Sequence, residues 1–297
     1  MKKVLSIVLC FVLAASLFGC GMSVGKEVNL RDKLASLMAT DDALGIKGKY
    51  SALSDITDGS VDKDLIGTWK TADGETSYVY NEDGTVKVTS EYGYTESKFT
   101  CLTLGEYKVI CDESEMESED VDGNITTSTV VSFSTYDVDN DALYFANVED
   151  TTDENMDSSQ YALMIMYRAD ESGSVDAAVA KNKIALDSFT GAWASEKGEI
   201  KIADGTLTLG EEVYDISMND KGKLVVDKDG SYTEYSVNIS VRKQYDGEDK
   251  TKATETTALG LYFTGADEND KPNLESVLDD WGEFTPNYFS GTFDLKQ

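Results

Sequence analysis

A short pattern that occurs twice in the chain constrains its fold more than any other feature. Each copy has a Gly-x-Trp triplet, then a Gly-Glu pair, then an Asp-Gly-Thr turn. These features lie at Gly67 to Trp69, 74–75 and 83–85 in the first copy, and at Gly191 to Trp193, 198–199 and 204–206 in the second. Three matches in one order indicate the duplication of a structural unit. We therefore predict two related domains in the 297 residues.

Both copies have the texture of an antiparallel sheet. Short runs rich in Val, Ile, Thr, Tyr and Phe alternate with turn sequences such as 81–84 and 227–230, and the chain contains only two prolines. The clearest strand is Thr233 to Val241, in which apolar and polar residues alternate. Tyr161 to Tyr167 is apolar on both faces, so we expect both faces of that strand to be covered.

Three passages have helical spacing of their apolar residues. They are a short helix from Leu30 to Met38, a helix over Ser174 to Ser188, and a helix over Asn273 to Trp281 that follows Pro272. The second lies between the two copies and is either a linker helix or a lid packed on one barrel. A final strand is expected near Tyr288 to Leu295. The sequence therefore predicts an all-β fold with short accessory helices.

The Gly-x-Trp triplet on a first strand, the series of hairpins and an Arg on a late strand resemble the lipocalin-like domains of bacterial lipoproteins. The resemblance covers residues from about 64 to 297 and implies two tandem antiparallel lipocalin-like β-barrels. In that family the Trp closes one end of the barrel and the Arg packs across its ring, as a cation-π contact. The matching residues are Gly67, Trp69 and Arg168 in the first copy, and Gly191, Trp193 and Arg242 in the second.

The N-terminus has the pattern of an export signal. Two lysines precede an apolar run from Val4 to Leu17, which is shorter than the roughly 20 residues that a spanning helix needs. Leu17 to Cys20 resembles the lipobox of bacterial lipoproteins, which implies that Cys20 is lipidated and becomes the first residue of the mature protein. Ordinary cleavage and a retained anchor are the alternatives. Multiple acyl chains on Cys20 would hold the protein stably on the extracytoplasmic face of the cell membrane.

These features divide the chain into five parts. They are a signal peptide over 1–19, a lipidated N-terminus and tether over 20–63, a first barrel over 64–170, a helical linker over 171–188 and a second barrel over 189–297.

Composition excludes several classes of function. The formal net charge of −30 opposes the binding of nucleic acid and of anionic lipid head groups, and favours solubility. The chain contains no histidine, which excludes Ser-His-Asp and Cys-His catalysis and imidazole metal sites. Serine motifs at 21–26 follow the lipidated cysteine directly, without the strand-turn-helix that a catalytic serine needs. We expect no cofactor and no metal.

Cys101 and Cys111 flank a predicted hairpin turn at 103–106. If the loop has an odd length, the two sulfur atoms can lie opposite each other and form a disulfide, which an extracytoplasmic location permits. Two ordinary small core residues are the equal alternative.

Residues 137–141 have the alternating Asp pattern that opens a calcium loop. The loop requires glycine where this chain has Ala142 and a glutamate where it has Val148. A hairpin turn with solvated carboxylates is therefore favoured, with weak surface binding of Ca²⁺ as the alternative.

Four tyrosines form two alternating pairs, Tyr78 with Tyr80 and Tyr92 with Tyr94. If they face solvent, they would make a stacking platform for sugars or a partner protein. If they face inward, they line the barrel, and this interpretation is favoured because strand aromatics are usually buried. A slip of one residue in register would exchange the two faces.

Together these features predict a non-enzymatic lipoprotein that binds a small hydrophobic ligand in a barrel lumen or serves as a scaffold in the cell envelope. An adhesion or glycan-binding module that uses exposed tyrosines is the second hypothesis. A glycoside hydrolase that uses paired carboxylates is the third.

Overall fold

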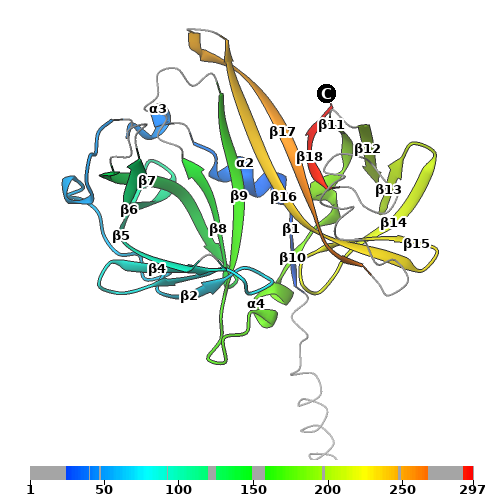
Figure 1. Ribbon diagram of the computed structural model, residues 1–297, viewed down its shortest axis with the longest axis horizontal. Coiled ribbons are helices and arrows are strands. Elements are labelled where there is room, and N and C mark those ends of the chain that lie inside the picture. Colours follow the sequence, from blue (N-terminus) through cyan, green and yellow to red (C-terminus); the bar gives the residue numbers. More distant parts are fainter. Residues whose placement is uncertain are drawn as a thin grey trace, which may run out of the picture.

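The computed structural model describes residues 25–39, 41–46, 48–91, 93–119, 125–148, 158–195, 198–246, 249–266 and 290–296. These residues are mostly in antiparallel β-strands, with a few short helices. Figure 1 shows a closed barrel beside a second group of strands, with a short helix between them. The expected signal peptide, Cys20, Tyr92 and the helix expected at 273–281 lie outside the described residues.

The first eight strands after the N-terminal segment close into a barrel, here called the N-terminal barrel. Each strand from β2 to β9 pairs antiparallel with the next, and β9 pairs with β2, which closes the ring. The strands are β2 Gly67–Lys70, β3 Ser77–Tyr80, β4 Thr85–Ser90, β5 Gly93–Leu104, β6 Tyr107–Glu119, β7 Ile125–Asp139, β8 Ala142–Val148 and β9 Ser158–Arg168. Closure leaves no free sheet edge around the ring.

The remaining eight strands form the C-terminal strand group, in which the pairings run from β11 through β18. In the ladder, β15 pairs with β16, and β18 pairs with both β17 and β11. The strands are β11 Gly191–Ser195, β12 Gly198–Ala203, β13 Thr206–Leu209, β14 Glu212–Met218, β15 Leu224–Lys228, β16 Ser231–Asp246, β17 Asp249–Ala266 and β18 Gly291–Leu295. The alternation predicted for 233–241 is present, since Tyr235 and Ile239 are buried in the core of this group.

Strand β9 joins the two halves of the molecule. Its first residues, 158–162, pair with residues 240–244 of β16, so that the strands of both halves form one continuous sheet. Met166 on one face lies in the core of the N-terminal barrel, whereas Leu163 and Tyr167 on the other face lie in a core that extends into the C-terminal strand group. Both faces are therefore covered, as the apolar sequence of this strand predicts.

The N-terminal segment packs on the folded body, and this corrects the expectation of a tether over 20–63. It contains β1 Lys26–Val28, α2 Leu30–Leu37, α3 Asp41–Leu44 and the 3₁₀ helix η1 Leu53–Asp55. Asn29 caps α2 by accepting hydrogen bonds from the amides of Arg31 and Asp32. The predicted helix is confirmed, but its apolar stripe of Leu30, Leu34 and Leu37 is buried against β8 and β9.

Residues 39–56 cover a different part of the N-terminal barrel. Ile46 and Ile56 form a small core with Leu102 and Val109 on the outer faces of β5 and β6. The prediction of a tether was wrong for these residues. Their apolar side chains are separated in the sequence by charged ones, so the sequence does not show that the apolar side chains pack together against the barrel.

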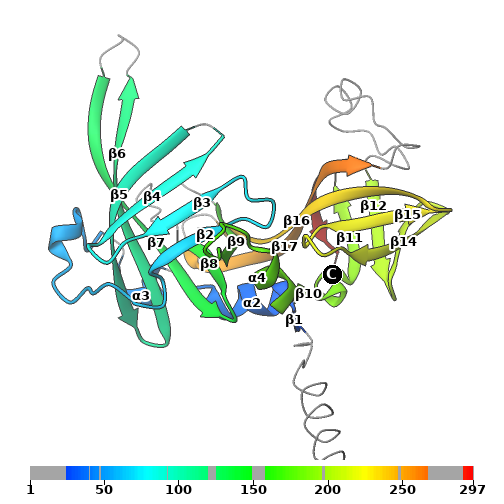
Figure 2. The same ribbon diagram turned by 90° about the horizontal axis from the view of Figure 1, so that it is seen from below.

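The expected linker helix is shorter than its sequence pattern. Helix α4 spans Asp176–Lys181, then β10 spans Asn182–Ile184 and the 3₁₀ helix η2 spans Leu186–Phe189. Strand β10 pairs in parallel with β1, which fixes the N-terminal segment at the junction between the two sets of strands. Figure 2 shows α2, α4, β1 and β10 gathered there.

Candidate functional site

Trp69 closes one end of the N-terminal barrel. Its side chain is fully buried, and the indole Nε1 donates a hydrogen bond to the carbonyl of Leu65 at 2.6 Å. The guanidinium carbon of Arg168 lies 4.1 Å from the centre of the Trp69 ring, which is the contact that the resemblance implies. Arg168 also donates to the carbonyls of Ile66 and Asp64, at 2.8 and 2.6 Å.

Gly67 makes this arrangement possible. Its φ is +126°, and a Cβ added there would lie 2.9 Å from Nη1 of Arg168. Only glycine combines that backbone conformation with room for the guanidinium.

Trp193 has matching surroundings in the C-terminal strand group. It is fully buried, and its Nε1 donates to the carbonyl of Phe189, again four residues earlier, at 2.7 Å. Gly191 has a φ of +151°, and a Cβ there would lie 2.6 Å from Cδ1 of Leu295. Leu295, which pairs with Trp193, thus occupies the position that Arg168 has opposite Trp69.

The expected pairing of Arg242 with Trp193 is wrong. Arg242 lies on β16, is exposed and forms an ion pair with Asp294. The cation near Trp193 is Arg31 of α2, whose guanidinium carbon lies 5.8 Å from the ring centre. The strand that closes the second cycle beside β11 is β18, so an Arg on β16 is on the wrong strand to cross Trp193.

The surroundings of Trp69 and Trp193, here called the first and second plugs, share a further feature, which Arg31 supplies in the second. Its Nη1 donates to the carbonyl of Thr190 at 2.9 Å, and Thr190 precedes Gly191 as Ile66 precedes Gly67. A guanidinium therefore reaches the same carbonyl position in both plugs, from a late strand in one and from the N-terminal helix in the other.

Towards the other end of the N-terminal barrel, the described inward-facing side chains become more exposed. Along its strands the inward-facing residues change from buried near Trp69 to partly or fully exposed at the far end. The pairs are Tyr80 and Tyr78 on β3, Val86 and Val88 on β4, Ile110 and Ser114 on β6, Tyr136 and Ser132 on β7, and Met166 and Met164 on β9. The more exposed end, which contains Tyr78, Val88, Ser97, Asp112, Ser132 and Met164, is called the mouth.

Asp112 is a carboxylate that faces into the mouth from β6. Its register pairs it with Phe99 and Ser132, on the inward face of the sheet. Its Oδ1 is buried, and none of the described residues donates a hydrogen bond to it. Burial raises the pKa of Asp112 from 3.8 to about 7, because the ionised form is poorly solvated there.

Asp62, a carboxylate near the Trp69 end of the same barrel, differs from Asp112 because its oxygen accepts hydrogen bonds. Burial alone would raise its pKa, but hydrogen bonds from Tyr136 and Lys108, at 2.6 and 2.9 Å, lower it. Asp112 has no such donor among the described residues at its Oδ1. A buried acceptor without a donor costs about 1 to 3 kcal/mol, so its retention needs a reason.

Aromatic rings surround the inner part of the mouth. Tyr78 stacks on Tyr80 with ring centres 6.1 Å apart and meets the ring of Phe145 edge-on at 6.1 Å. Tyr80 meets Phe99 edge-on at 4.9 Å. Burial first, and then the charge of Asp112, raise the pKa of both tyrosines, which agrees with rings that lie close to its carboxylate.

The surface platform of four tyrosines is therefore not formed. Tyr78 and Tyr80 line the inside of the barrel, whereas Tyr94 is 68% exposed on the outside, where Lys87 lies 4.4 Å from its ring centre. Interior lining, the favoured interpretation, holds for Tyr78 and Tyr80 and fails for Tyr94, because its register with Thr89 turns it outward.

Cys101 and Cys111 are both free and buried. The register pairs Cys101 with Ile110 and Cys111 with Thr100, since the turn between β5 and β6 has an even number of residues. Cys101 thus faces the barrel interior and Cys111 faces the outer core beneath residues 39–56. A disulfide is excluded in this register, and the alternative of two small core residues describes the structure.

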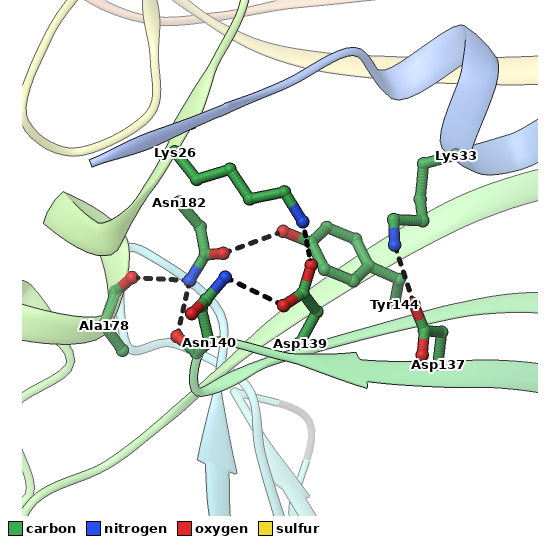
Figure 3. Close-up of polar contacts among 8 residues, drawn as sticks. All are labelled: Lys26, Lys33, Asp137, Asp139, Asn140, Tyr144, Ala178 and Asn182. Atoms are coloured by element: carbon green, nitrogen blue, oxygen red, sulfur yellow. Dashed lines mark hydrogen bonds and ion pairs between the residues drawn. The ribbon is translucent and has the colours of Figure 1, made fainter. Parts of the chain in front are cut away.

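Asp137 and Asp139 pair with lysines of the N-terminal segment (Figure 3), and Asp141 pairs with Lys181 of α4. Lys33 donates to Asp137 at 2.7 Å, Lys26 forms an ion pair with Asp139, and Lys181 forms one with Asp141. Asn140 and Asp141 have positive φ, as a tight hairpin turn requires. The predicted turn is present, and its partly exposed carboxylates are paired with basic side chains.

Buried Asn182 completes this junction. Its side-chain amide donates to the carbonyls of Asn140 and Ala178, at 2.8 and 3.0 Å, and its oxygen accepts a hydrogen bond from the Tyr144 hydroxyl at 3.3 Å. The carboxylates and the amide of the junction are satisfied by protein groups, so the junction is structural.

A groove of about 350 Å³ lies between α2 and strands β16 and β17. Its floor includes Leu34 and Ile239, and its charged residues already have partners, since Lys243 pairs with Glu255 at 3.0 Å and Arg31 binds the carbonyl of Thr190. The mouth, with the unsatisfied oxygen of Asp112, is therefore the stronger candidate site.

No family model matches this chain. The curated proteins and the solved structures likewise contain no significant match. In the described part of the chain, no helix is long and apolar enough to cross a membrane. The same residues contain no group of three or more Cys, Asp or Glu that could hold a metal ion.

Asp112 was not among the residues that the sequence predicted as functional. Tyr107, Val109 and Cys111 suggest that the core side of this strand is the one opposite to Asp112, but those residues face the outer core that residues 39–56 cover. The available signal was the alternation Lys108, Ile110, Asp112, which places a carboxylate in register with Phe99 and Cys101.

We predict that both arginines stabilise the fold and that Arg168 contributes more. Arg168→Ala should lower the free energy of unfolding by about 2 to 4 kcal/mol and Arg31→Ala by about 1 to 2 kcal/mol, since each loses charged hydrogen bonds and a ring contact. Urea denaturation measures both values. The exposed Lys201→Ala on β12 is the control and should stay within about 0.5 kcal/mol. A neutral Arg31→Ala together with a destabilising Arg242→Ala would contradict this assignment.

We also predict that Asp112 makes stability depend on pH. Because the folded pKa is raised to about 7, wild-type stability should fall as pH rises from about 4 to 7. Asp112→Asn removes this loss, so its advantage over wild type should grow from near zero at pH 4 to about 2 to 4 kcal/mol at pH 8. Urea denaturation across this range tests it, with the outward-facing, exposed Glu96→Gln as control. A pH-independent difference would refute the raised pKa.

Proposed function

We propose that this protein binds a small, mainly apolar ligand in the mouth of the N-terminal barrel. The observation that carries the proposal is the buried Oδ1 of Asp112, which no described residue satisfies. Sites for small molecules are mostly apolar concavities with a few polar groups that fix orientation. Tyr78, Phe145 and Met164 would supply the apolar wall, and Asp112 the orienting group.

The proposal includes a duplicated architecture, in which the C-terminal strand group is a second lipocalin-like barrel. Three observations support it. Both glycines have positive φ two residues before a buried tryptophan, both indoles donate to the carbonyl four residues earlier, and both sets of eight strands have pairings that return to their first strand. The second barrel would be the less open of the two, because its interior is part of a continuous apolar core.

The same proposal places the protein on the extracytoplasmic face of a membrane, held by acyl chains on Cys20. Only five residues separate Cys20 from Lys26, the first residue of β1. Even fully extended, this length reaches about 20 Å. The folded body would therefore sit close to the lipid surface, and the junction around β1 and β10 would be its nearest part.

The other hypotheses have weaker support. A glycan-binding platform needs exposed aromatic residues in a group, but Tyr78 and Tyr80 face inward. A carboxylate-pair hydrolase needs two acids about 5 to 10 Å apart. Among the inward-facing strand residues that the structure describes in the N-terminal barrel, Asp112 is the single carboxylate.

Protein purified from its own host should release a small molecule on denaturation. Native mass spectrometry should show a species heavier than the apoprotein, and extraction with organic solvent should remove the added mass. Asp112→Ala should carry less of the ligand because it removes the orienting group, while Glu96→Gln should match wild type. A wild-type protein that is empty in every preparation would refute the proposal.

Cys20→Ser should release the protein from the membrane fraction of the host. The intact mass of the wild type should exceed that of the chain from Cys20 by the mass of two or three acyl groups, because one chain alone binds a membrane only marginally. Fractionation followed by mass spectrometry measures both effects. An unmodified wild-type protein in the soluble extracytoplasmic fraction would contradict lipidation.

A further inference from the structure

The charge distribution inside the N-terminal barrel restricts the chemistry of its ligand. Along the described stretches of its strands, inward positions carry three charged residues, which are Lys108, Asp112 and Arg168. Lys108 pairs with Asp62, and Arg168 crosses Trp69 and binds the carbonyls of Ile66 and Asp64, all at the plugged end. Asp112 is therefore the one charge that faces the mouth within these stretches.

The lysines of the neighbouring strands β4 and β5 point away from the mouth. Lys87 and Lys98 lie on outward positions of β4 and β5, where the register pairs them with Glu96 and Glu113. Burial, with no contribution from a basic group, accounts for the raised pKa of Asp112. The titratable groups that interact with its charge are Tyr78, Tyr80, Cys101 and Cys111, and none of them carries a positive charge.

The surroundings favour an organic cation over a metal ion. Calcium and magnesium take six or more oxygen ligands, and no cluster of acids that could provide them occurs in the described residues. Aromatic faces attract ammonium groups, and the interaction is strongest when both partners are desolvated. Tyr78 and Tyr80 are the rings close enough to the carboxylate to sense its charge, and Phe145 meets Tyr78 edge-on.

We propose that the ligand of the mouth is a small amphiphilic amine, whose ammonium group pairs with Asp112 while its apolar part lies against Tyr78, Phe145 and Met164. This inference rests on the proposed function, because it names the chemical class of the ligand bound in the same mouth. An ammonium donor would satisfy Oδ1 and also neutralise the charge, which a hydroxyl donor cannot do.

The whole molecule favours the same sign of ligand. The formal net charge of −30 produces a negative potential that concentrates cations near the protein and repels anions. Because this long-range effect is screened by salt, the local pairing with Asp112 must account for any selectivity that persists at high ionic strength.

Three probes of similar size separate these effects: 2-phenylethylamine, 2-phenylethanol and 3-phenylpropanoate. Calorimetric titration of the purified protein at pH 8 and about 0.5 M salt should show the amine binding at least about tenfold more tightly than the alcohol, and the acid binding most weakly. At pH 8 both the amine and Asp112 are charged.

Asp112→Asn should reduce amine affinity to within about threefold of the alcohol and leave alcohol affinity unchanged, whereas Glu96→Gln should retain the wild-type order. Equal affinities for amine and alcohol in the wild type, or tighter binding of the acid, would overturn the amine assignment while leaving ligand binding in the mouth intact. Selectivity that survives in Asp112→Asn would also overturn it. If none of the probes binds and the host protein carries no small molecule, the proposed function itself fails.

Discussion

Strand β9 is apolar on both faces, and the need to cover both of them organises the molecule. Met166 on one face completes the interior of the N-terminal barrel, whereas Leu163 and Tyr167 on the other face require a cover of their own. Helix α2 provides that cover with Leu30 and Leu34. Each such side chain contributes about 1.5 to 3 kcal/mol when it leaves water, so this contact outweighs any single ion pair on the surface.

The position of α2 determines several other features. It brings Arg31 to the carbonyl of Thr190 beside Trp193, and it brings Lys33 to Asp137 and 4.5 Å from the ring centre of Tyr144. The two plugs consequently reach the same geometry by different routes. Beside Trp69, strand β9 supplies the guanidinium of Arg168. Beside Trp193, the corresponding strand β18 supplies Leu295, and the guanidinium of Arg31 comes from the N-terminal helix.

Sequence analysis predicted the parts of this structure that depend on local patterns. The antiparallel strands, the hairpin at 139–142, the double-sided burial of β9 and the helix at Leu30 all follow from alternation, turn residues and helical spacing. The pairing of Arg31 with Trp193 could not be predicted, because it depends on which strand closes the second cycle. Asp112 was missed for a related reason. Strand β6 has apolar residues on both faces, and only the cover provided by residues 39–56 shows which face is interior.

The contribution of α2 to the second plug has a consequence for how the protein is made. Arg31 and Leu34 belong to the start of the chain, whereas Trp193 lies in its second half and strands β16 to β18 follow later still. Until those strands are made, the apolar stripe of α2 lacks part of the surface that buries it. Cutting the chain at the linker would separate Arg31 from Trp193. A fragment that begins after residue 171 would therefore lack part of its own core, and the two halves are better regarded as one folding unit.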